Sequence, residues 1–291
     1  PSNSTPGAAG VNVMDMSDPA NPRLVTRLST PAMNSPHESL VVSKERGVLA
    51  AVLGNPFFGP GVVDLYDISV DCRAPVLKAS LPVAFFGHES GISPDGMTLY
   101  ASWLYGPQVT AIDISNLTAP VPLAALQFYS HGLSISDDGN RAYLAGGGIV
   151  DQRDLGLVVL DVSEIQARKT NPQVRVVSRL TWDNITIPQN ALPITIKGKP
   201  YLVEIDEFSN SSNTGFVSAH GSRVGAGRII DISDETKPKV ISDLRLEVHQ
   251  PENRAAIADD PGAQSATQGY AGHYCNVPTR VDPSIVACSM I

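Results

Sequence analysis

Histidine is rare in this sequence, and its positions follow a pattern. Only six histidines occur among 291 residues, and four of them stand at the beginning of an apolar, strand-like run: His37, His88, His131 and His273. Neutral imidazole nitrogens that converge from several strands can bind a transition metal at about 2.0 to 2.2 Å. The four histidines are therefore candidate ligands for Cu, Fe, Mn or Zn. The alternatives are a structural role, in which each imidazole bonds to a neighbouring backbone carbonyl, and a metal-free ligand pocket.

Two glutamates accompany these histidines and are the candidate catalytic groups. Glu38 and Glu89 directly follow two of the four histidines. A carboxylate in that place could fix the tautomer of a ligating imidazole, serve as a ligand itself, or act as a base. The matching place in the fourth repeat unit holds no histidine, and its nearest equivalents are Gln189 and Asn190.

The histidines lie within a sequence repeat that predicts the elements around them. Five short β-branched runs end in Asp, a hydrophobic residue and Ser, with the aspartates at Asp15, Asp67, Asp113, Asp161 and Asp231. A turn and a second apolar run follow each of them, which is the pattern of a β-hairpin. Three of the hairpins are preceded by another pair of runs, so that a unit holds four strands in roughly 45 to 50 residues. We expect the aspartates to accept hydrogen bonds from the turn backbone.

These units predict an all-β protein, a β-propeller of four-stranded blades whose first strands line a central channel. A β-sandwich of similar composition is the alternative. The first unit has only an outer strand pair and the last only an inner pair, so the two either close a five-bladed ring or belong to a larger ring of about seven blades. We expect the larger ring, completed by further blades or by a second polypeptide. After an N-terminal extension at 1–9, the units lie at about 10–31, 37–82, 88–128, 131–180, 185–247 and 273–291.

The Asp-x-Ser repeats and their Pro-containing turns resemble the LVIVD-repeat family of bacterial exported or surface proteins, from about Gly10 to Ile291. The resemblance implies a β-propeller in an exported, periplasmic or cell-surface location. A ring of histidines on the channel axis also resembles, in architecture, the carotenoid oxygenases and the selenium-binding proteins. The long fourth unit departs from the repeat by an insert at 208–227, which we expect to be a surface loop. We expect 250–269 to be a second loop, and His220 and His249 to face solvent.

Two of the three cysteines are placed to form a disulfide. Cys275 and Cys288 flank residues 280–284, which read as the turn of the last hairpin. Cross-strand partners lie about 4.5 to 5.5 Å apart, within the span of a disulfide, and such a bond would support export. The alternative is that Cys275, two residues from His273, is a metal ligand. Cys72 has no evident partner, and we expect it to be free.

Composition excludes several classes of function. The chain is 42% apolar and 17% charged, with a net charge of −8, which disfavours nucleic acid and anionic membrane surfaces as partners. No apolar run is long enough to cross a bilayer. The sequence begins at Pro1 without a leader, so we expect a processed form or a piece of a longer chain.

The sequence therefore predicts an exported propeller with a histidine-lined channel that takes a small-molecule ligand. The function that fits best is a metal-dependent enzyme that carries out oxidation or lyase chemistry on a small organic molecule. The alternative is a non-catalytic cell-surface scaffold that binds a protein or an envelope partner.

Overall fold

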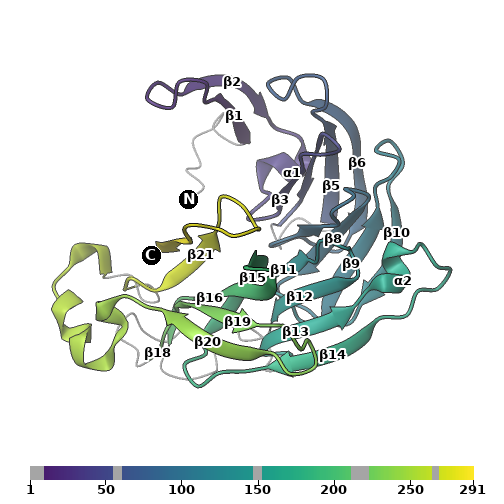
Figure 1. Cartoon of the computed structure of the whole chain (residues 1–291). Helices are drawn as coiled ribbons and strands as arrows, with labels where there is room; N and C mark the ends of the chain where they lie inside the picture. Colours follow the sequence, from purple (N-terminus) through teal and green to yellow (C-terminus); the bar gives the residue numbers. More distant parts are fainter. Residues whose placement is uncertain (1–9, 55–60, 147–152, 211–222, 264–268) are drawn as a thin grey trace.

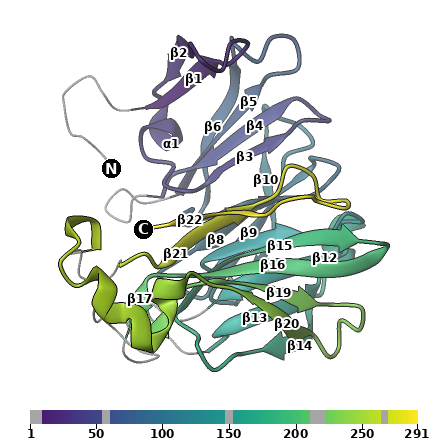
Figure 2. The same cartoon turned by 60° about the vertical axis from the view of Figure 1, so that its left-hand side comes forward.

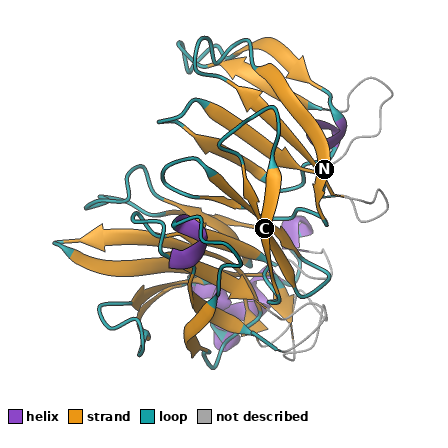
Figure 3. Cartoon of the chain, turned by 90° about the vertical axis from the view of Figure 1, so that its right-hand side faces the viewer, coloured by secondary structure: helices purple, strands orange, loops and turns teal. Residues whose placement is uncertain are grey.

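The computed structural model describes residues 10–54, 61–146, 153–210, 223–263 and 269–291. Four antiparallel four-stranded sheets follow one another along this part of the chain and are arranged as an arc (Figure 1). Strands dominate, and the few helices are short (Figure 3). The prediction of an all-β propeller with four-stranded blades is confirmed.

The strands of each sheet are paired in chain order. The first sheet holds β3 (Leu40–Ser43), β4 (Val48–Val52), β5 (Gly61–Asp67) and β6 (Val76–Ala84). The second holds β7 (Gly91–Ile92), β8 (Thr98–Trp103), β9 (Gln108–Asp113) and β10 (Val121–Leu126). The third holds β11 (Gly132–Ile135), β12 (Arg141–Gly146), β13 (Gly156–Asp161) and β14 (Arg175–Leu180). The fourth holds β15 (Ile187–Ile196), β16 (Lys199–Glu207), β19 (Gly227–Asp231) and β20 (Lys239–Leu244).

Two separate strand pairs stand at the ends of the described chain. They are β1 (Val11–Asp15) with β2 (Arg23–Leu28), and β21 (Gly272–Asn276) with β22 (Ala287–Met290). Within the described residues the two pairs share no ladder, so they do not form one blade. The yellow β21–β22 pair instead lies between the sheet of β3 and the sheet of β15 and β16 (Figure 2). The larger ring stays a prediction.

The first strand of each sheet occupies the inner side of the arc. Each of β3, β7, β11 and β15 is an edge strand of its own sheet. Neighbouring first strands pack beside one another, β3 with β7, β7 with β11, β11 with β15 and β15 with β21. These five strands line the central channel and position the residues that the histidine pattern singles out.

The hydrophobic core lies between neighbouring sheets, which bury both of their faces. On β12, Leu144 packs against Tyr100 and Val109 of the second sheet. The adjacent Tyr143 points the other way and packs with Leu202 and other residues of the fourth sheet. This alternation with period two is why the inner strands of each blade are apolar on successive residues.

The repeated aspartates close the hairpin turns, as the sequence predicts. In each one the Oδ1 atom accepts a hydrogen bond from the backbone N–H of the serine two residues later, for example over 3.0 Å from Ser69 to Asp67. The other four bonds measure 2.7 to 3.0 Å and join Ser17 to Asp15, Ser115 to Asp113, Ser163 to Asp161 and Ser233 to Asp231.

Short helices add a little to the strands. The single-turn helix α1 (Pro31–Asn34) packs on β5, where Asp64 accepts a hydrogen bond from the Ala32 N–H over 2.8 Å. The other single turn, α2 (Ser163–Gln166), follows β13. None of the helices in the described residues is long and apolar enough to span a membrane.

Two predicted loops differ from the expectation. The insert at 208–227 begins and ends in a small ladder, β17 (Ser209–Asn210) with β18 (Arg223–Val224), and 211–222, with His220, lie outside the described residues. The second stretch forms three 3₁₀ turns, η1 (Glu247–His249), η2 (Pro251–Ile257) and η3 (Pro261–Ala263). Proline at the first position of η2 presets the backbone for such a turn.

The expectation that His249 faces solvent is wrong. Its side chain is buried beneath these turns, where Nδ1 accepts a hydrogen bond from the Leu246 N–H over 3.1 Å. Its Nε2 atom therefore carries the proton and donates to the Tyr270 carbonyl over 2.6 Å. The η1 turn covers the imidazole, and the hydrogen bonds at both ring nitrogens hold the imidazole in place.

The last strand pair is cross-linked. Cys275 and Cys288 are register partners on β21 and β22 and form a disulfide, which confirms the predicted pairing. Cys275 is therefore not a metal ligand. Cys72 is free and exposed, as expected.

Candidate metal centre in the central channel

The backbone fixes the predicted histidines at the start of the inner strands. His131 immediately precedes β11, His88 lies three residues before β7, and both are buried. The His88 N–H donates to the Ser102 carbonyl over 2.9 Å. The His131 carbonyl accepts from the Ser102 hydroxyl over 3.1 Å and from the Glu89 N–H over 3.4 Å. Adjacent blades are thus tied together at the level of the histidines.

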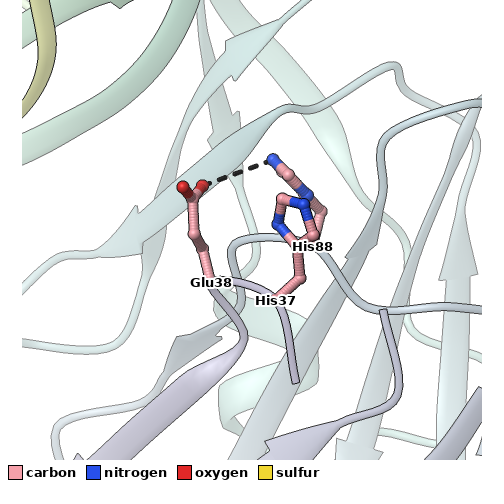
Figure 4. A group of neighbouring side chains, drawn as sticks. All are labelled: His37, Glu38 and His88. Carbon is pink, nitrogen blue, oxygen red and sulfur yellow. Dashed lines mark ion pairs between the residues drawn. The ribbon is translucent and has the colours of Figure 1, made fainter. Parts of the chain in front are cut away.

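Three side chains converge at this end of the channel. His37, Glu38 and His88 place their ligand atoms within 4.8 Å of one another (Figure 4). The His88 Nε2 atom lies 3.4 Å from the Glu38 Oε2 atom, and the two imidazole ring centroids are 4.3 Å apart. Among the residues that the structure describes, no other set of three histidine, cysteine or carboxylate side chains is so close.

The backbone at His37 has an unusual conformation. Its φ angle is +50°, in the left-handed region that side chains other than glycine rarely adopt. The conformation turns the chain just before β3, and consecutive side chains of His37 and Glu38 both lie at the cluster. Outliers of this kind gather at functional sites.

His131 and His273 flank the three-residue cluster rather than belonging to it. The His131 ring centroid is 4.6 Å from that of His88. The His273 Nε2 atom lies 2.8 Å from the Glu38 Oε1 atom. Gln189, the expected equivalent in the fourth unit, donates from Nε2 to the other oxygen of Glu38 over 2.7 Å. Both oxygens of Glu38 are therefore oriented by neighbours.

Glu207 joins the site although the sequence reasoning missed it. It is the last residue of β16, and its carboxylate lies 3.5 Å from the His131 Nε2 atom and 3.3 Å from the His273 Nε2 atom. The signal that could have found it is the cluster Glu204, Asp206 and Glu207 in an otherwise apolar strand. Acidic residues are rarely buried unless they have partners or a function.

Burial separates the charge states of these groups. Burial, together with the neighbouring His131, lowers the pKa of His88 to about 2, and burial lowers the pKa of His131 to about 3. Both imidazoles are therefore neutral at pH 7. Burial is the largest single influence on Glu38 and raises its pKa. The hydrogen bond with His273 and the charges of His88, His273 and His37 together outweigh burial, so the pKa lies below its usual value. The cluster thus combines a carboxylate with a neutral imidazole.

The flanking pair is shifted in the opposite direction. Burial raises the pKa of Glu207 to about 8. The hydrogen bond with Glu38 raises the pKa of His273 above its ordinary value. A carboxyl group whose pKa is raised to about 8, beside an imidazole whose pKa is also raised, suits acid–base chemistry.

A cavity of about 220 Å³ opens on these groups. Its volume suits a molecule of few non-hydrogen atoms. It is lined by His37, Glu38, His88, His131 and Glu207, with Leu104, Tyr105 and Phe208 supplying the remaining wall.

The residues present fit a transition-metal ion. The His88 Nε2 atom is buried and makes no hydrogen bond, which leaves its lone pair available in the direction of Glu38. Two imidazoles and one carboxylate are a donor set typical of Fe²⁺ and related ions, and such a set leaves the remaining coordination positions of the ion open. His273 and Gln189 hold the carboxylate in the manner of outer partners of a metal ligand.

Glu89, the second candidate catalytic residue, turns away from this cavity. Its carboxyl is buried, hydrogen-bonded with Tyr274, and lines a different cavity of the channel. Burial and the charge of Glu38 raise the pKa of Glu89 well above its ordinary value. Gly132 makes room for it, because a Cβ atom there would collide with the Glu89 carboxyl and the Gln189 carbonyl.

Comparison of sequences identifies no family for the chain. No protein-family profile matches it, and no curated protein matches it in sequence.

Comparison of folds finds β-propellers of low sequence identity. A periplasmic gluconolactonase of Pseudomonas aeruginosa is 11% identical with a TM-score of 0.64, and the alignment covers 98% of this chain and 73% of the gluconolactonase chain. A putative 6-phosphogluconolactonase of Bacteroides uniformis is 14% identical with a TM-score of 0.56, covering 81% and 65%. The Cps50 (Swd1) β-propeller domain of Myceliophteria thermophila is 10% identical with a TM-score of 0.50, covering 88% and 64%. The chain spans about two thirds of the length of the solved structures it resembles, and the shared property is the β-propeller fold.

Proposed function

We propose that the chain belongs to an exported β-propeller enzyme that binds one divalent transition-metal ion through His37, Glu38 and His88. The observation that carries the proposal is the buried His88 Nε2 atom, which has no hydrogen bond and lies 3.4 Å from an oriented carboxylate. A buried polar atom without a partner costs about 1 to 3 kcal/mol, and a bound ion removes that cost.

Lyase-type chemistry on a small oxygen-containing molecule fits the neighbouring residues. The metal ion would supply Lewis-acid polarisation of a substrate oxygen. Glu207 acts in its ionised form, which becomes the major form as the pH rises through about 8. In that form it takes the proton from the substrate carbon, the electron pair forms the new C=C bond, and the adjacent C–O bond breaks. His273 gives its proton to the departing oxygen, so that water or an alcohol leaves.

Export is supported by the disulfide and by the resemblance to the LVIVD-repeat family. A disulfide persists mainly outside the reducing cytosol. One of the similar solved structures is described as periplasmic. We include membership of the LVIVD-repeat family in the proposal on the basis of the Asp-x-Ser repeats.

Metal titration tests the site directly. The chain is stripped with a chelator, titrated with Fe²⁺, Mn²⁺, Zn²⁺ or Cu²⁺, and its bound metal is measured by elemental analysis. We expect about one equivalent in the unchanged chain and less than about 0.2 equivalents after His88→Gln or Glu38→Gln. His131→Gln is the matched control, because it removes a neighbouring buried imidazole that is not a ligand. Less than about 0.2 equivalents in the unchanged chain would overturn the proposal.

A non-catalytic surface scaffold is the second candidate. The connection between β21 and β22 exposes Val281 by 60% and Ile285 by 62%, which a bound protein would cover. Two results together would favour this function. The chain would bind no metal, and it would capture a single envelope protein that the double variant Val281→Ser, Ile285→Ser no longer captures.

A further inference from the structure

The small cavity at the metal-site residues has a second wall, which is apolar. Besides the histidines and glutamates described above, it is lined by Leu104, Tyr105 and Phe208, and two of these three side chains are aromatic. The larger cavity of the channel, of about 440 Å³, differs in this respect. Among the described residues that line it, Tyr274 is the single aromatic one. The polar wall accounts for metal and proton chemistry, and the aromatic wall has no part in either.

An unusual backbone conformation places Phe208 at this cavity. Its φ angle is +60°, in the left-handed region, which is a genuine outlier for a bulky side chain. The Phe208 N–H donates to the Gly272 carbonyl over 3.3 Å, and the Phe208 carbonyl accepts from the Gly225 N–H over 2.8 Å. Consecutive residues of a regular strand point to opposite faces, whereas Glu207 and Phe208 line the same cavity. Strain of this kind is typical of functional sites.

Tyr105 lines the same cavity from the turn between β8 and β9, and it is 50% exposed. The turn rests on the side chain of Trp103. The Gly106 N–H donates to the Trp103 carbonyl over 3.3 Å, and a Cβ atom at Gly106 would collide with the Trp103 ring. The centroid of that ring lies 4.3 Å from the centroid of the Phe85 ring. The turn that carries Tyr105 is therefore anchored on packed aromatic rings.

The same segment of backbone connects the aromatic wall to the metal-site residues. Ser102, which directly precedes Trp103, accepts a hydrogen bond from the His88 N–H over 2.9 Å. Phe86, two residues before His88, has its ring centroid 6.2 Å from that of Trp103. The wall and the candidate metal ligand are thus fixed relative to each other, so one small molecule in the cavity contacts both.

An aromatic ring on the substrate suits both walls. Aromatic rings pack on aromatic side chains in offset or edge-to-face arrangements, which stabilise the contact beyond the burial of apolar area. A ring attached to the carbon that loses its proton also delocalises the electron pair that becomes the C=C bond, and the proton is then easier to remove. A saturated ring of the same size offers neither advantage.

We propose that the substrate of this site is a 2-arylethanol or an ether of one, and this inference rests on the proposed function. The aromatic ring packs against Tyr105 and Phe208, and the oxygen lies toward His88. Glu207 takes a proton from the CH₂ group beside the ring, and the electron pair forms a C=C bond conjugated with the ring. The C–O bond breaks, its electron pair stays on oxygen, and His273 protonates that oxygen. The products are an arylalkene and water, or an alcohol where the substrate is an ether.

Binding of 2-phenylethanol to the full chain tests the aromatic wall. Its dissociation constant is measured by ligand-observed NMR titration, first with the chelator-stripped chain and then with Zn²⁺ added. The control is 2-cyclohexylethanol, which keeps the ring size, the linker and the hydroxyl group but has no π face. We expect 2-phenylethanol to bind about two- to tenfold more tightly than the control in both states. Equal dissociation constants for the two compounds would overturn the proposal.

Replacing Tyr105 assigns this preference to the wall. Tyr105→Leu keeps an apolar side chain without a ring, and it should lower the ratio of the two dissociation constants by at least about twofold. Tyr105→Phe keeps the ring and should retain the preference. A ratio that is the same in Tyr105→Leu as in the unchanged chain would also overturn the proposal.

Paramagnetic relaxation gives the orientation of the bound molecule. Mn²⁺ relaxes nearby protons with a steep dependence on distance, so the protons on the oxygen-bearing carbon should relax faster than the para proton of the ring. The opposite order would refute the proposed orientation. Glu38→Gln, which should lose the ion, is the control.

The metal content of the same samples separates this inference from the proposed function. A chain that binds no metal but prefers 2-phenylethanol would refute the metal-dependent function and support the aromatic wall. A chain that binds metal but shows no preference would refute the aromatic substrate alone.

Discussion

The imidazole Nε2 atom of His273 lies 2.8 Å from the Oε1 atom of Glu38, although 235 positions separate the two residues in the sequence. The contact joins the last inner strand to the first. Among the described residues the two end strand pairs share no ladder, and this contact instead links β21 to the residues just before β3.

Replacing His273 should weaken metal binding without abolishing it. His273→Ala removes the group that orients Glu38, and loss of such an outer partner typically lowers metal affinity about 10- to 100-fold. The affinity is measured by competition with a coloured chelator. Asn276→Ala, at the exposed last residue of the same strand, is the control. Unchanged affinity in His273→Ala would show that Glu38 is oriented by other groups.

Removing the disulfide should destabilise the chain. The bond closes a separation of 13 residues, for which the chain-entropy estimate is about 3 kcal/mol at 25 °C. We expect the double variant Cys275→Ser, Cys288→Ser to lose up to this much in urea unfolding. Cys72→Ser, at the free and exposed cysteine, should unfold at the unchanged midpoint. Equal urea midpoints for the double variant and for Cys72→Ser would mean that the disulfide contributes nothing to the stability of the chain.

The buried Arg228 should be far more sensitive than an exposed arginine. Its guanidinium pairs with Glu204 and with Asp206, over 3.0 Å to the latter, and stacks 4.1 Å from the centre of the Trp182 ring. Arg228→Met leaves two buried carboxylates without a cation, which costs about 3 to 5 kcal/mol.

The matched control for this change is Arg175→Met. Arg175 is 56% exposed and pairs with Glu164 on the surface, so its loss should change the unfolding free energy by less than about 1 kcal/mol. Similar unfolding free energies for the two variants, measured in urea, would refute the inferred role of the buried network.

The turn aspartates should lose their contribution to stability in acid. Hydrogen bonds from the Ser69 side chain and backbone lower the pKa of Asp67 from 3.8 to about 2. A lowered pKa in the folded state means that the contribution is present above pH 3.8 and is lost as the pH falls through about 2. NMR titration of the Asp67 carboxyl should give the low midpoint, and Ser69→Ala should raise it. A midpoint near 3.8 in the unchanged chain would contradict the turn geometry.

The strand edges at the ends of the described chain should promote association. Within the part of the chain that the structure describes, both β1 and β22 are paired on one side only. Unpaired edges tend to recruit further strands, so we expect the chain by itself to be oligomeric or poorly soluble. Sedimentation velocity measures this, and Ala287→Lys on β22 should shift the distribution toward monomer. A monodisperse monomer of the unchanged chain would show that the edges are protected.

The fold was predictable because its signal is local and repeated. Each Asp-x-Ser segment marks one hairpin, and every copy has a turn hydrogen bond equivalent to the one from Ser69 to Asp67. The inner position of His88 and His131 followed from the same repeat. Glu207 could not be predicted in this way, because its place depends on where β16 ends beside a strand from another unit. His249 was misjudged because a buried position inside 3₁₀ turns leaves no periodic pattern in the sequence.

His88 and Glu89 are consecutive residues, yet one side chain lines the small cavity and the other lines the large one. A single peptide unit therefore forms part of the wall between two chambers. Any displacement of that unit by an occupant on one side alters the geometry offered to an occupant on the other. Thermodynamic reciprocity would then apply to two occupants: whatever factor an ion in the small cavity contributes to the affinity of a molecule in the large cavity, that molecule must return to the affinity of the ion.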